Sequence, residues 1–544
     1  MTQLLKRYSF GLMFIAIICI ATVLRLYKLD QVPSGMSWDE AAIGYNGYAI
    51  WTVHRDEWLH FMPFSFKSFG DFKAPFAIYL NGIFTVLFGL QLWVIRLPFV
   101  IAGVASIIGM AWLIHLLFQV FPFRQENQKN ASQLTVLGIA FIITTSPWHI
   151  FFTRAGFESG MAMGFMIWGM CFFLQSLHTQ SKRFLFVGLS VISFVLGLYT
   201  YHSAKIFLPI FFVVLFAFFF QSIKKHFAVY SFGLIFGIIL LTPLVYDSVL
   251  GQGTERFSQT SLFSNQKLTS TEKLTTFVSN YAHQFSPAFL FAGETTTLRH
   301  GDGHWGVLFL TDGLLLIATT IWFILLSVSK KAARFSSPLS KIYLLGVSWF
   351  LIGLLPAAIG MEIPHANRAL LSYPGFLIIE ALGIFFLLEK LTASSKPTVK
   401  LVVQALLGTG FMLHVFFVVS FTHDYFSKYS LDSAEAFQYG YKEVFDYVLP
   451  RESQVEKVLI TSKYGQPYIY TLLYRHTNAI LYHGGALSKY EYPDTVNIGD
   501  VIRKNAIVVA TPEELDPSIA DQLILAPSGE VRFVIINTAE HPRL

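Results

Sequence analysis

The chain has 544 residues, of which 54% are hydrophobic and only 13% are charged. Soluble domains carry about 25% charged residues, so this composition excludes an ordinary soluble protein and predicts many membrane-spanning helices. The net charge of +6 comes from short basic clusters between apolar runs, which is typical of membrane topology signals and not of nucleic-acid binding. Cys19 and Cys171 both lie inside apolar runs, so they provide neither a disulfide framework nor a cysteine metal site.

Eleven segments are apolar over the roughly 20 residues that a spanning helix needs. They are 8–26, 97–120, 132–152, 159–178, 184–201, 205–221, 228–246, 306–328, 341–359, 370–389 and 401–421. Lys6 and Arg7 precede the first segment and no small-residue cleavage site follows it, so we expect an uncleaved signal anchor. A further apolar stretch, 76–95, contains Asn81 and ends directly before Arg96, which leaves its placement ambiguous.

The positive-inside rule resolves that ambiguity. If 76–95 does not cross, the basic linkers all face the cytoplasm; these are Arg124/Lys129, Lys182/Arg183, Lys224/Lys225, Lys330/Lys331/Arg334 and Lys390/Lys396/Lys400. If it crossed once, all of them would face outward. We therefore predict an integral, multi-pass plasma-membrane protein with a cytoplasmic N-terminus, an extracytoplasmic C-terminal domain, and 76–95 as an interfacial or re-entrant segment. An even number of extra crossings would keep the same parity.

The predicted fold is an all-α polytopic bundle over residues 1–421 with a small α/β domain after it. Two extracytoplasmic loops interrupt the bundle, one at 27–96 with interfacial helices and a second large one at 247–305. Region 422–544 changes character, because short apolar runs there are typical of buried strands and "QPYIYTLLYRH" is typical of a helix. The expected strands are 457–462, 478–483, 505–512 and 532–538.

Charged residues gather at the predicted outer ends of the spans. Any one cluster alone favours a structural ion pair or an interfacial anchor. Charges at membrane depth cost several kcal/mol unless they are paired or face a polar cavity, so five clusters of both signs on one face favour a substrate site. The clusters contain Asp39 and Glu40; Lys73; Arg154 and Glu158; His202 and Lys205; and His365 and Arg368.

This mixture of charges indicates a lipid-phosphate substrate. Arg and Lys are the usual partners of phosphoryl oxygens, and we expect substrate contacts from Lys73, Arg154, His202, Lys205, His365 and Arg368. A nearby carboxylate, Asp39 or Glu158, can act as a general base toward an acceptor hydroxyl. Glu40 is expected to support Asp39. The pattern therefore predicts transfer of a group from a lipid phosphate carrier to a hydroxyl.

The sequence demands no metal or cofactor. Asp39, Glu40 and Glu158 could supply hard oxygen ligands to a divalent cation. No ligand spacing requires one, so we expect no obligatory cofactor and leave a divalent cation open. "HGDGHWG" (300–306) is interpreted as a capped loop before a span rather than as a metal site, with substrate contact from His304 or Trp305 as the weaker alternative.

An ordered series of short elements resembles the GT-C membrane glycosyltransferases, in particular the protein O-mannosyltransferase and lipid A aminoarabinose transferase group. It comprises an acidic pair after the first span (Asp39, Glu40), a K-x-P-x-x-x-Y element beginning at Lys73, "FG…IRLP" between Phe88 and Pro98, and an Arg-x-x-x-acid turn formed by Arg154 and Glu158.

The resemblance implies a polyprenyl-phosphate-linked sugar as donor and inversion at the anomeric carbon. It implies that Asp39 is the catalytic base and that Lys73 contacts the donor phosphate. The family's turn usually carries Asp where this chain has Glu158, which leaves the role of that residue open. The acceptor would be a hydroxyl of a protein, lipid or glycan, and the C-terminal region matches no known module.

Two other functions compete with this hypothesis. A transporter or flippase of lipid-linked sugars would show broken helices and inverted repeats near the midplane, and the sequence shows neither. A polymerase- or ligase-type glycan enzyme outside the family would share the donor chemistry and differ in its acceptor.

Overall fold

The computed structural model describes residues 2–121, 127–250, 259, 261–328, 338–501 and 505–539. The chain forms two compact units, which we call the helical unit (Met1–Tyr27, Phe99–Thr296 and Gly303–Thr422) and the mixed unit (Lys28–Pro98, Thr297–Asp302 and His423–Leu544). Four basic residues used in the topology prediction lie outside the described residues; they are Arg124, Lys330, Lys331 and Arg334.

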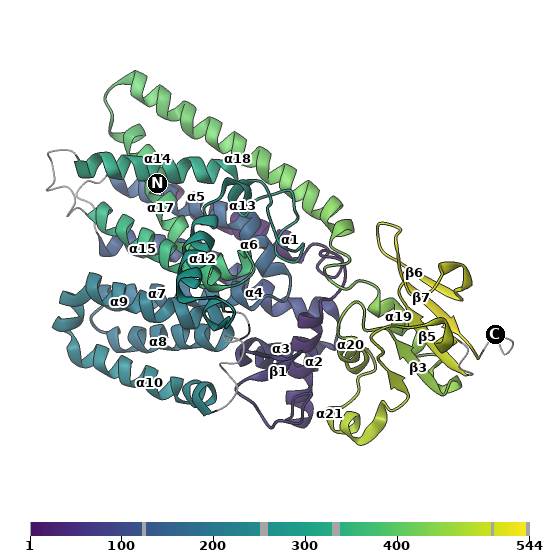
Figure 1. The fold of residues 1–544 in the computed structure, drawn as a ribbon. Coiled ribbons are helices and arrows are strands. Elements are labelled where there is room, and N and C mark those ends of the chain that lie inside the picture. The colour runs from purple at the N-terminus through teal and green to yellow at the C-terminus, as the bar shows by residue number, and fades with distance from the viewer. Residues whose placement is uncertain are drawn as a thin grey trace. The chain divides into compact units, whose positions relative to one another are not determined.

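Long apolar helices make up the helical unit (Figure 1). They are α1 (Thr2–Leu26), α4 (Leu92–Val120), α5 (Asn127–Thr145), α6 (Pro147–Arg154), α7 (Glu158–His178), α8 (Arg183–Thr200), α9 (His202–Lys225), α10 (Phe227–Leu250), α14 (Leu310–Val328), α15 (Pro338–Ile359), α17 (Tyr373–Ala393) and α18 (Pro397–Asp432). Shorter helices lie between them, namely α12 (Ser270–His283), α13 (Pro287–Phe291) and α16 (Ala366–Ala369).

Every predicted span is helical, and the chain is a multi-pass membrane protein. Within the described residues, nine helices are long and apolar enough to cross a membrane. The predicted span 132–152 is not straight, because α5 and α6 bend by 57° at a break where Ser146 caps α6 and Pro147 lacks an N–H. The predicted span 306–328 is a shorter apolar helix, Leu310–Leu326.

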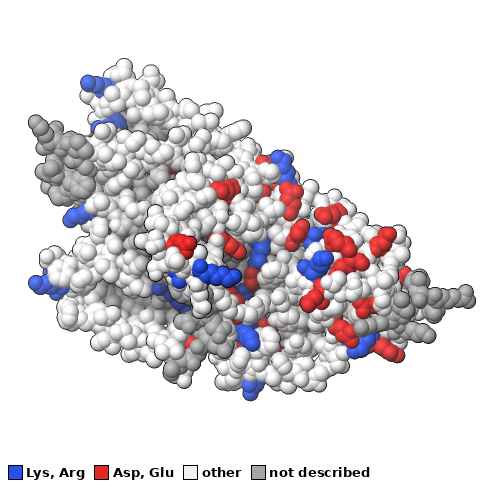
Figure 2. Space-filling view, viewed as in Figure 1, with Lys and Arg blue, Asp and Glu red and all other residues white. Residues whose placement is uncertain are grey.

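The distribution of charge agrees with this assignment. In Figure 2 the flanks of the long helices carry almost no charged side chains, and the Lys and Arg visible there lie near helix ends. Charged side chains of both signs gather over the sheet and helices of the mixed unit. Uncharged, apolar helix flanks are suited to lipid.

The mixed unit contains a five-stranded sheet with the order β4-β3-β5-β7-β6. Its strands are β3 (Lys457–Ile460), β4 (Tyr490–Glu491), β5 (Ala506–Ala510), β6 (Gln522–Leu525) and β7 (Val531–Asn537). β3 pairs in parallel with β4 and β5, whereas β7 pairs antiparallel with β5 and β6. Helices α19 (Tyr441–Val448) and α20 (Pro467–Tyr474) lie beside the sheet (Figure 1). This confirms the α/β character predicted for the C-terminal region.

One predicted strand is wrong. Residues 478–483 form α21 (Ala479–Leu481) and the start of a helical turn, Tyr482–Ala486. Asn478 caps this helix by accepting the N–H of Ile480. Ile480 and Leu481 are exposed, so the apolar run never acquires the buried face that a strand in a sheet requires.

The first loop and the C-terminal region share one hydrophobic core. Helix α2 (Trp38–Val53) contributes Ala41, Ala42 and Tyr45 to a buried cluster that also contains Val458 and Phe533 of the sheet. The hydroxyl of Tyr45 donates to the carbonyl of Thr477 at 2.7 Å. Packing against α20 within this shared core therefore fixes the helix that starts at the acidic pair.

Helix α3 (Pro75–Phe88) packs closely on α2 and accounts for the ambiguous stretch 76–95. Its 14 residues span about 21 Å, which is shorter than the roughly 30 Å hydrocarbon core. Gly47 and Gly82 meet at the crossing, where a Cβ on Gly82 would lie 2.3 Å from the carbonyl oxygen of Gly47. A two-stranded hairpin, β1 (Phe66–Ser68) and β2 (Asp71–Lys73), precedes α3 and ends at Lys73.

Candidate active site

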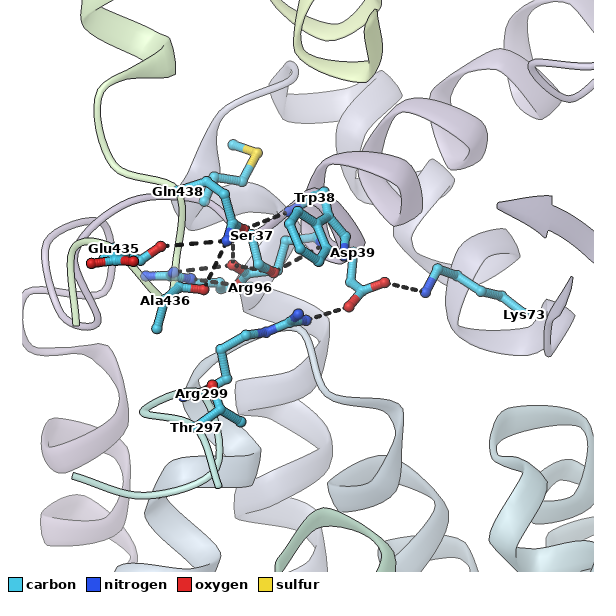
Figure 3. A network of polar contacts seen from close by, with 12 residues as sticks. Ser37, Trp38, Asp39, Lys73, Arg96, Thr297, Arg299, Glu435, Ala436 and Gln438 are labelled. Atoms are coloured by element: carbon cyan, nitrogen blue, oxygen red, sulfur yellow. Dashed lines mark hydrogen bonds and ion pairs between the residues drawn. The ribbon is translucent and has the colours of Figure 1, made fainter. Parts of the chain in front are cut away.

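The start of α2 is built to hold its acidic pair in place. The hydroxyl of Ser37 accepts the N–H of Glu40 at 3.3 Å, and the Glu40 carboxylate accepts the N–H of Ser37 at 3.0 Å, which forms a reciprocal capping box. The side-chain oxygen of Gln438 also accepts the N–H of Trp38 at 3.2 Å. These bonds satisfy N–H groups of the first turn and orient Asp39 (Figure 3).

Glu40 forms a fully buried ion pair. Arg96 donates from Nε to Oε1 of Glu40 at 2.7 Å and from its terminal nitrogen to Oε2 at 3.2 Å. The same guanidinium donates to the carbonyls of Leu29, Pro33 and Gly35 at 2.8–3.0 Å. Glu40 therefore neutralises an arginine that ties together the segment leading into α2.

Asp39 is part-exposed and lies between two cations (Figure 3). Lys73 Nζ lies 2.5 Å from Oδ1, and Arg299 pairs with Oδ2. Burial raises the pKa of Asp39, but the charges of Lys73 and Arg299 outweigh it and hold this pKa far below its usual range. In this state both oxygens of Asp39 are occupied by cations.

Arg299 is a site residue that sequence reasoning missed. It belongs to the short segment Thr297–Asp302 of the mixed unit, 260 positions from Asp39 in the chain. Its guanidinium lies 5.4 Å from the ring centroid of Trp38, so a cation–π contact supports the ion pair. The only local signal was a cation directly before "HGDGHWG", a stretch that we interpreted as a capped loop.

Glu57 is a second missed acid near Lys73. Its side chain is buried and neither carboxyl oxygen has a hydrogen-bond partner among the described residues, although its N–H donates to Asn46 Oδ1 at 2.8 Å. Burial raises the pKa of Glu57 to about 8, and the charge of Lys73 lowers it only in part. Burial thus favours the neutral form of the Glu57 carboxyl.

The other predicted site residues lie in the helical unit. Arg154, at the end of α6, is fully buried and donates to the carbonyls of Leu24 and Tyr27. Glu158 is the first residue of α7 and is partly exposed.

In two other places a histidine and a cation lie at the start of a helix of that unit, α9 and α16. His202 is the first residue of α9, and Lys205 lies one turn later. His365 caps α16 by accepting the N–H of Arg368 at 3.4 Å, and its Nε2 lies 3.8 Å from Glu362. The Arg368 guanidinium packs on Gly360, where a Cβ would come within 2.4 Å of it.

No three His, Cys, Asp or Glu side chains among the described residues are grouped so that they could hold a metal ion. The two carboxylates of the acidic pair already contact Lys73, Arg96 and Arg299. The arrangement is therefore suited to handling an anion through its cations.

No protein-family model and no curated protein matches the sequence. Solved structures do match. ArnT from Cupriavidus metallidurans bound to undecaprenyl phosphate aligns with a TM-score of 0.52 and 11% identity, over 96% of this chain and 97% of that one.

Two structures of the oligosaccharyltransferase of Archaeoglobus fulgidus are also similar. The enzyme tethered to an acceptor peptide with the NVT sequon aligns at a TM-score of 0.51 and 13% identity, over 97% of this chain and 74% of that one. AglB from the same organism, in complex with an inhibitory peptide and a dolichol-phosphate, aligns with a TM-score of 0.50 and 14% identity. The alignment covers 98% of this chain and 74% of that one. At this identity the likeness concerns the fold, and it confirms the resemblance at that level: the chain has the fold of the GT-C membrane glycosyltransferases.

Proposed function

We propose that this protein is an inverting glycosyltransferase that moves a sugar from a polyprenyl-phosphate donor to a hydroxyl of a protein, lipid or glycan acceptor. The observation that carries the proposal is the carboxylate of Asp39 held between Lys73 and Arg299 at the capped start of α2. Solved proteins of this fold include one bound to undecaprenyl phosphate and one in complex with a dolichol-phosphate, which supports a lipid-phosphate donor.

The resting ion pairs explain how donor binding would prepare the site. Lys73 and Arg299 are the natural partners of a phosphate, and arginine matches phosphoryl oxygens in a bidentate geometry. A phosphate that takes these cations releases Asp39 from them. The pKa of Asp39 then rises from its depressed value, because the attraction that lowered it is lost. The carboxylate becomes a stronger base only when the donor is in place.

The proposed reaction is a single displacement. The acceptor oxygen attacks the anomeric carbon, its proton passes to Asp39, and the bond between that carbon and the phosphate oxygen breaks. The bonding electron pair leaves with the lipid phosphate, whose added charge Lys73 and Arg299 stabilise. The oxygens of Asp39 and Glu40 already contact cations of the chain, so none of the proposed steps uses a metal.

The remaining predicted residues receive narrower roles. Glu40 and Arg96 form the buried pair that fixes the segment before Asp39. For Arg154 we propose a positioning role, because its guanidinium ties α6 to the end of α1. As candidate substrate contacts we retain Glu158, His202, Lys205, His365 and Arg368. We further propose that the acidic pair faces the extracytoplasmic side and that the N-terminus is cytoplasmic.

The test is a bond-cleavage assay on purified protein in lipid nanodiscs. Lipid-linked sugars extracted from the native membrane are incubated with the protein, and free polyprenyl phosphate is measured by mass spectrometry. We expect Asp39→Asn to lower its release about 100-fold or more, because the general base is lost. Asp446→Asn is the matched control, since Asp446 is an exposed acid paired with Lys442 on α19 and should leave release unchanged.

Two results would contradict the proposal. Release by Asp39→Asn at the wild-type rate, with equal protein in the nanodiscs, would remove Asp39 from the chemistry. In sealed proteoliposomes, wild-type protein that moves the lipid-linked sugar across the bilayer without cleaving it would instead support a transporter.

A further inference from the structure

A cleft in the mixed unit lies directly beside the segment that leads into α2. Its volume is about 390 Å³, within the range of about 300–1,000 Å³ typical of small-molecule sites. The turn between α3 and α4 forms one wall, and the start of α19 together with α20 forms the other. Gly35 and Met36, the residues before the cap of α2, also line it.

The wall next to the start of α2 is closely packed. Gly35 has φ +91°, and a Cβ there would lie 2.5 Å from the carbonyl oxygen of Phe437, so the two backbones touch. Gln438 lines the cleft while its side-chain oxygen accepts the N–H of Trp38. Asp39 directly follows Trp38 in the chain. A molecule in the cleft would thus contact residues that help to position Asp39.

Trp93 and four tyrosines are among the residues that line the cleft, and two of these tyrosines, Tyr441 and Tyr470, are themselves buried. Trp93 is 38% exposed, and its indole N–H donates to Gln91 at 2.6 Å, which fixes the plane of the ring. Tyr441 and Tyr470 are stacked with centroids 4.1 Å apart. The negative face of an aromatic ring favours contact with the polarised C–H groups of a sugar ring.

The charges of the cleft favour a hydroxyl-rich ligand over an anion. Asp30 and Glu443 line it, and within the described part of the chain neither forms an ion pair. Lys442, the cation at its border, is already paired with Asp446 at 2.6 Å. Carboxylates accept hydrogen bonds from hydroxyls, whereas they would repel a phosphate or another acid. The walls are helices and turns, so the cleft offers no strand edge onto which a peptide could add.

We propose that this cleft binds a carbohydrate portion of the acceptor, stacked on Trp93 and hydrogen-bonded to Asp30 and Glu443. The inference rests on the proposed glycosyl transfer and narrows its acceptor from any hydroxyl compound to a sugar-bearing one. A saccharide held here would lie next to the start of α2, where Asp39 is proposed to take the acceptor proton.

Binding is tested on the full-length protein in nanodiscs by saturation-transfer NMR and calorimetry. The probes are maltotetraose, chitotetraose, the deacetylated chitosan tetramer, and a Ser/Thr-containing tetrapeptide. We expect saturable binding of at least one saccharide, and a loss of about tenfold in affinity in Trp93→Ala. Phe61→Ala is the matched control, because Phe61 is 68% exposed on the same unit and does not line the cleft.

A second measurement separates this inference from the proposed function. Trp93→Ala should release polyprenyl phosphate to water at the wild-type rate while its transfer to the bound saccharide falls. Wild-type protein that releases no polyprenyl phosphate but binds saccharide through Trp93 would sink the proposed function and leave the cleft assignment standing. The cleft assignment is overturned if no saccharide binds, if Trp93→Ala binds as well as Phe61→Ala, or if the tetrapeptide binds in a Trp93-dependent way.

Discussion

Asp39 and Glu40 are neighbours in sequence with opposite environments. Glu40 is 1% exposed and its oxygens serve Ser37 and Arg96, so it is a structural charge. Asp39 is part-exposed and meets Lys73 and Arg299. Removing one partner of a buried pair such as Glu40–Arg96 is costly, since it leaves the other charge buried alone. A loss of activity in a Glu40 variant would therefore report on folding before it reports on catalysis.

Glu57 makes the stability of the mixed unit depend on pH. Its pKa is raised from 4.5 to about 8 in the folded protein by burial. The stability that comes from binding this proton is therefore fully present below pH 4.5 and is lost as the pH rises through 8. The full loss amounts to about 5 kcal/mol, at about 1.4 kcal/mol for each pH unit between 4.5 and 8. In Glu57→Gln the side chain is neutral at every pH, so this slope disappears.

The measurement is thermal unfolding in detergent between pH 5 and 9. We expect the wild-type melting temperature to fall relative to that of Glu57→Gln over this range, and exposed Glu530→Gln to follow the wild type. Parallel profiles for wild type and Glu57→Gln would show that the carboxyl is already ionised in the folded state.

At the residue scale, the sequence allowed part of the site to be predicted. Asp39 and Lys73 are both in the first loop, 34 positions apart. Each belongs to a short sequence element that can be recognised, the acidic pair after the first span and the K-x-P-x-x-x-Y element. Arg299 reaches Asp39 only through the fold, and nothing near it in the sequence marks it as a partner. Glu57 follows Asp56 in a loop where an acid is ordinarily exposed, and its burial became visible only in the structure.

Among the elements, the crossing of α2 and α3 sets the spacing of the site. α2 begins at the acidic pair, and α3 follows Lys73 after a single residue, Ala74. The close approach at Gly47 and Gly82 therefore determines how far Lys73 stands from Asp39. The helical character of α2 and α3 can be predicted from the sequence. The distance between the two helices depends on this backbone contact and is harder to predict.

Gly82→Ala tests this dependence. The new Cβ would lie 2.3 Å from the Gly47 carbonyl oxygen and from Trp51, so we expect a destabilisation of about 1–3 kcal/mol and slower release of polyprenyl phosphate. Gly408→Ala on α18 is the control, because no atom lies within 4 Å of its Cβ. Melting temperature and release rate are measured together. Equal behaviour of the two variants would show that the crossing does not hold the site.

The elements also show where pattern reasoning succeeds and fails. Long apolar runs predicted every spanning helix, because a helix in lipid must satisfy its own backbone groups. The bend at Ser146–Pro147 was visible as a proline, but hydropathy alone gave one straight span. The strand predicted at 478–483 was wrong because a short apolar run does not reveal whether it will be buried, and Asn478 caps a helix there instead.

At the scale of the whole molecule, the predicted orientation can be checked with single cysteines. In a background with Cys19 and Cys171 replaced, we expect Glu530→Cys in the C-terminal region to react with a membrane-impermeant maleimide added to intact cells. Lys182→Cys, between α7 and α8, should react only after the membrane is permeabilised. Labelling of both cysteines, or of Lys182→Cys alone, in intact cells would contradict the orientation.

In the proposed mechanism Asp39 and the donor phosphate compete for Lys73 and Arg299, and equilibrium binding of undecaprenyl phosphate measures this competition. Affinities are measured in nanodiscs for wild type, Asp39→Asn, Lys73→Met and Arg299→Met. We predict binding at least tenfold weaker for the two cation variants, and tighter binding for Asp39→Asn, since its loss removes the competing carboxylate. Asp39→Asn would thus bind the lipid phosphate better while transferring no sugar. Weaker binding by Asp39→Asn, or unchanged binding by Lys73→Met and Arg299→Met, would contradict the account.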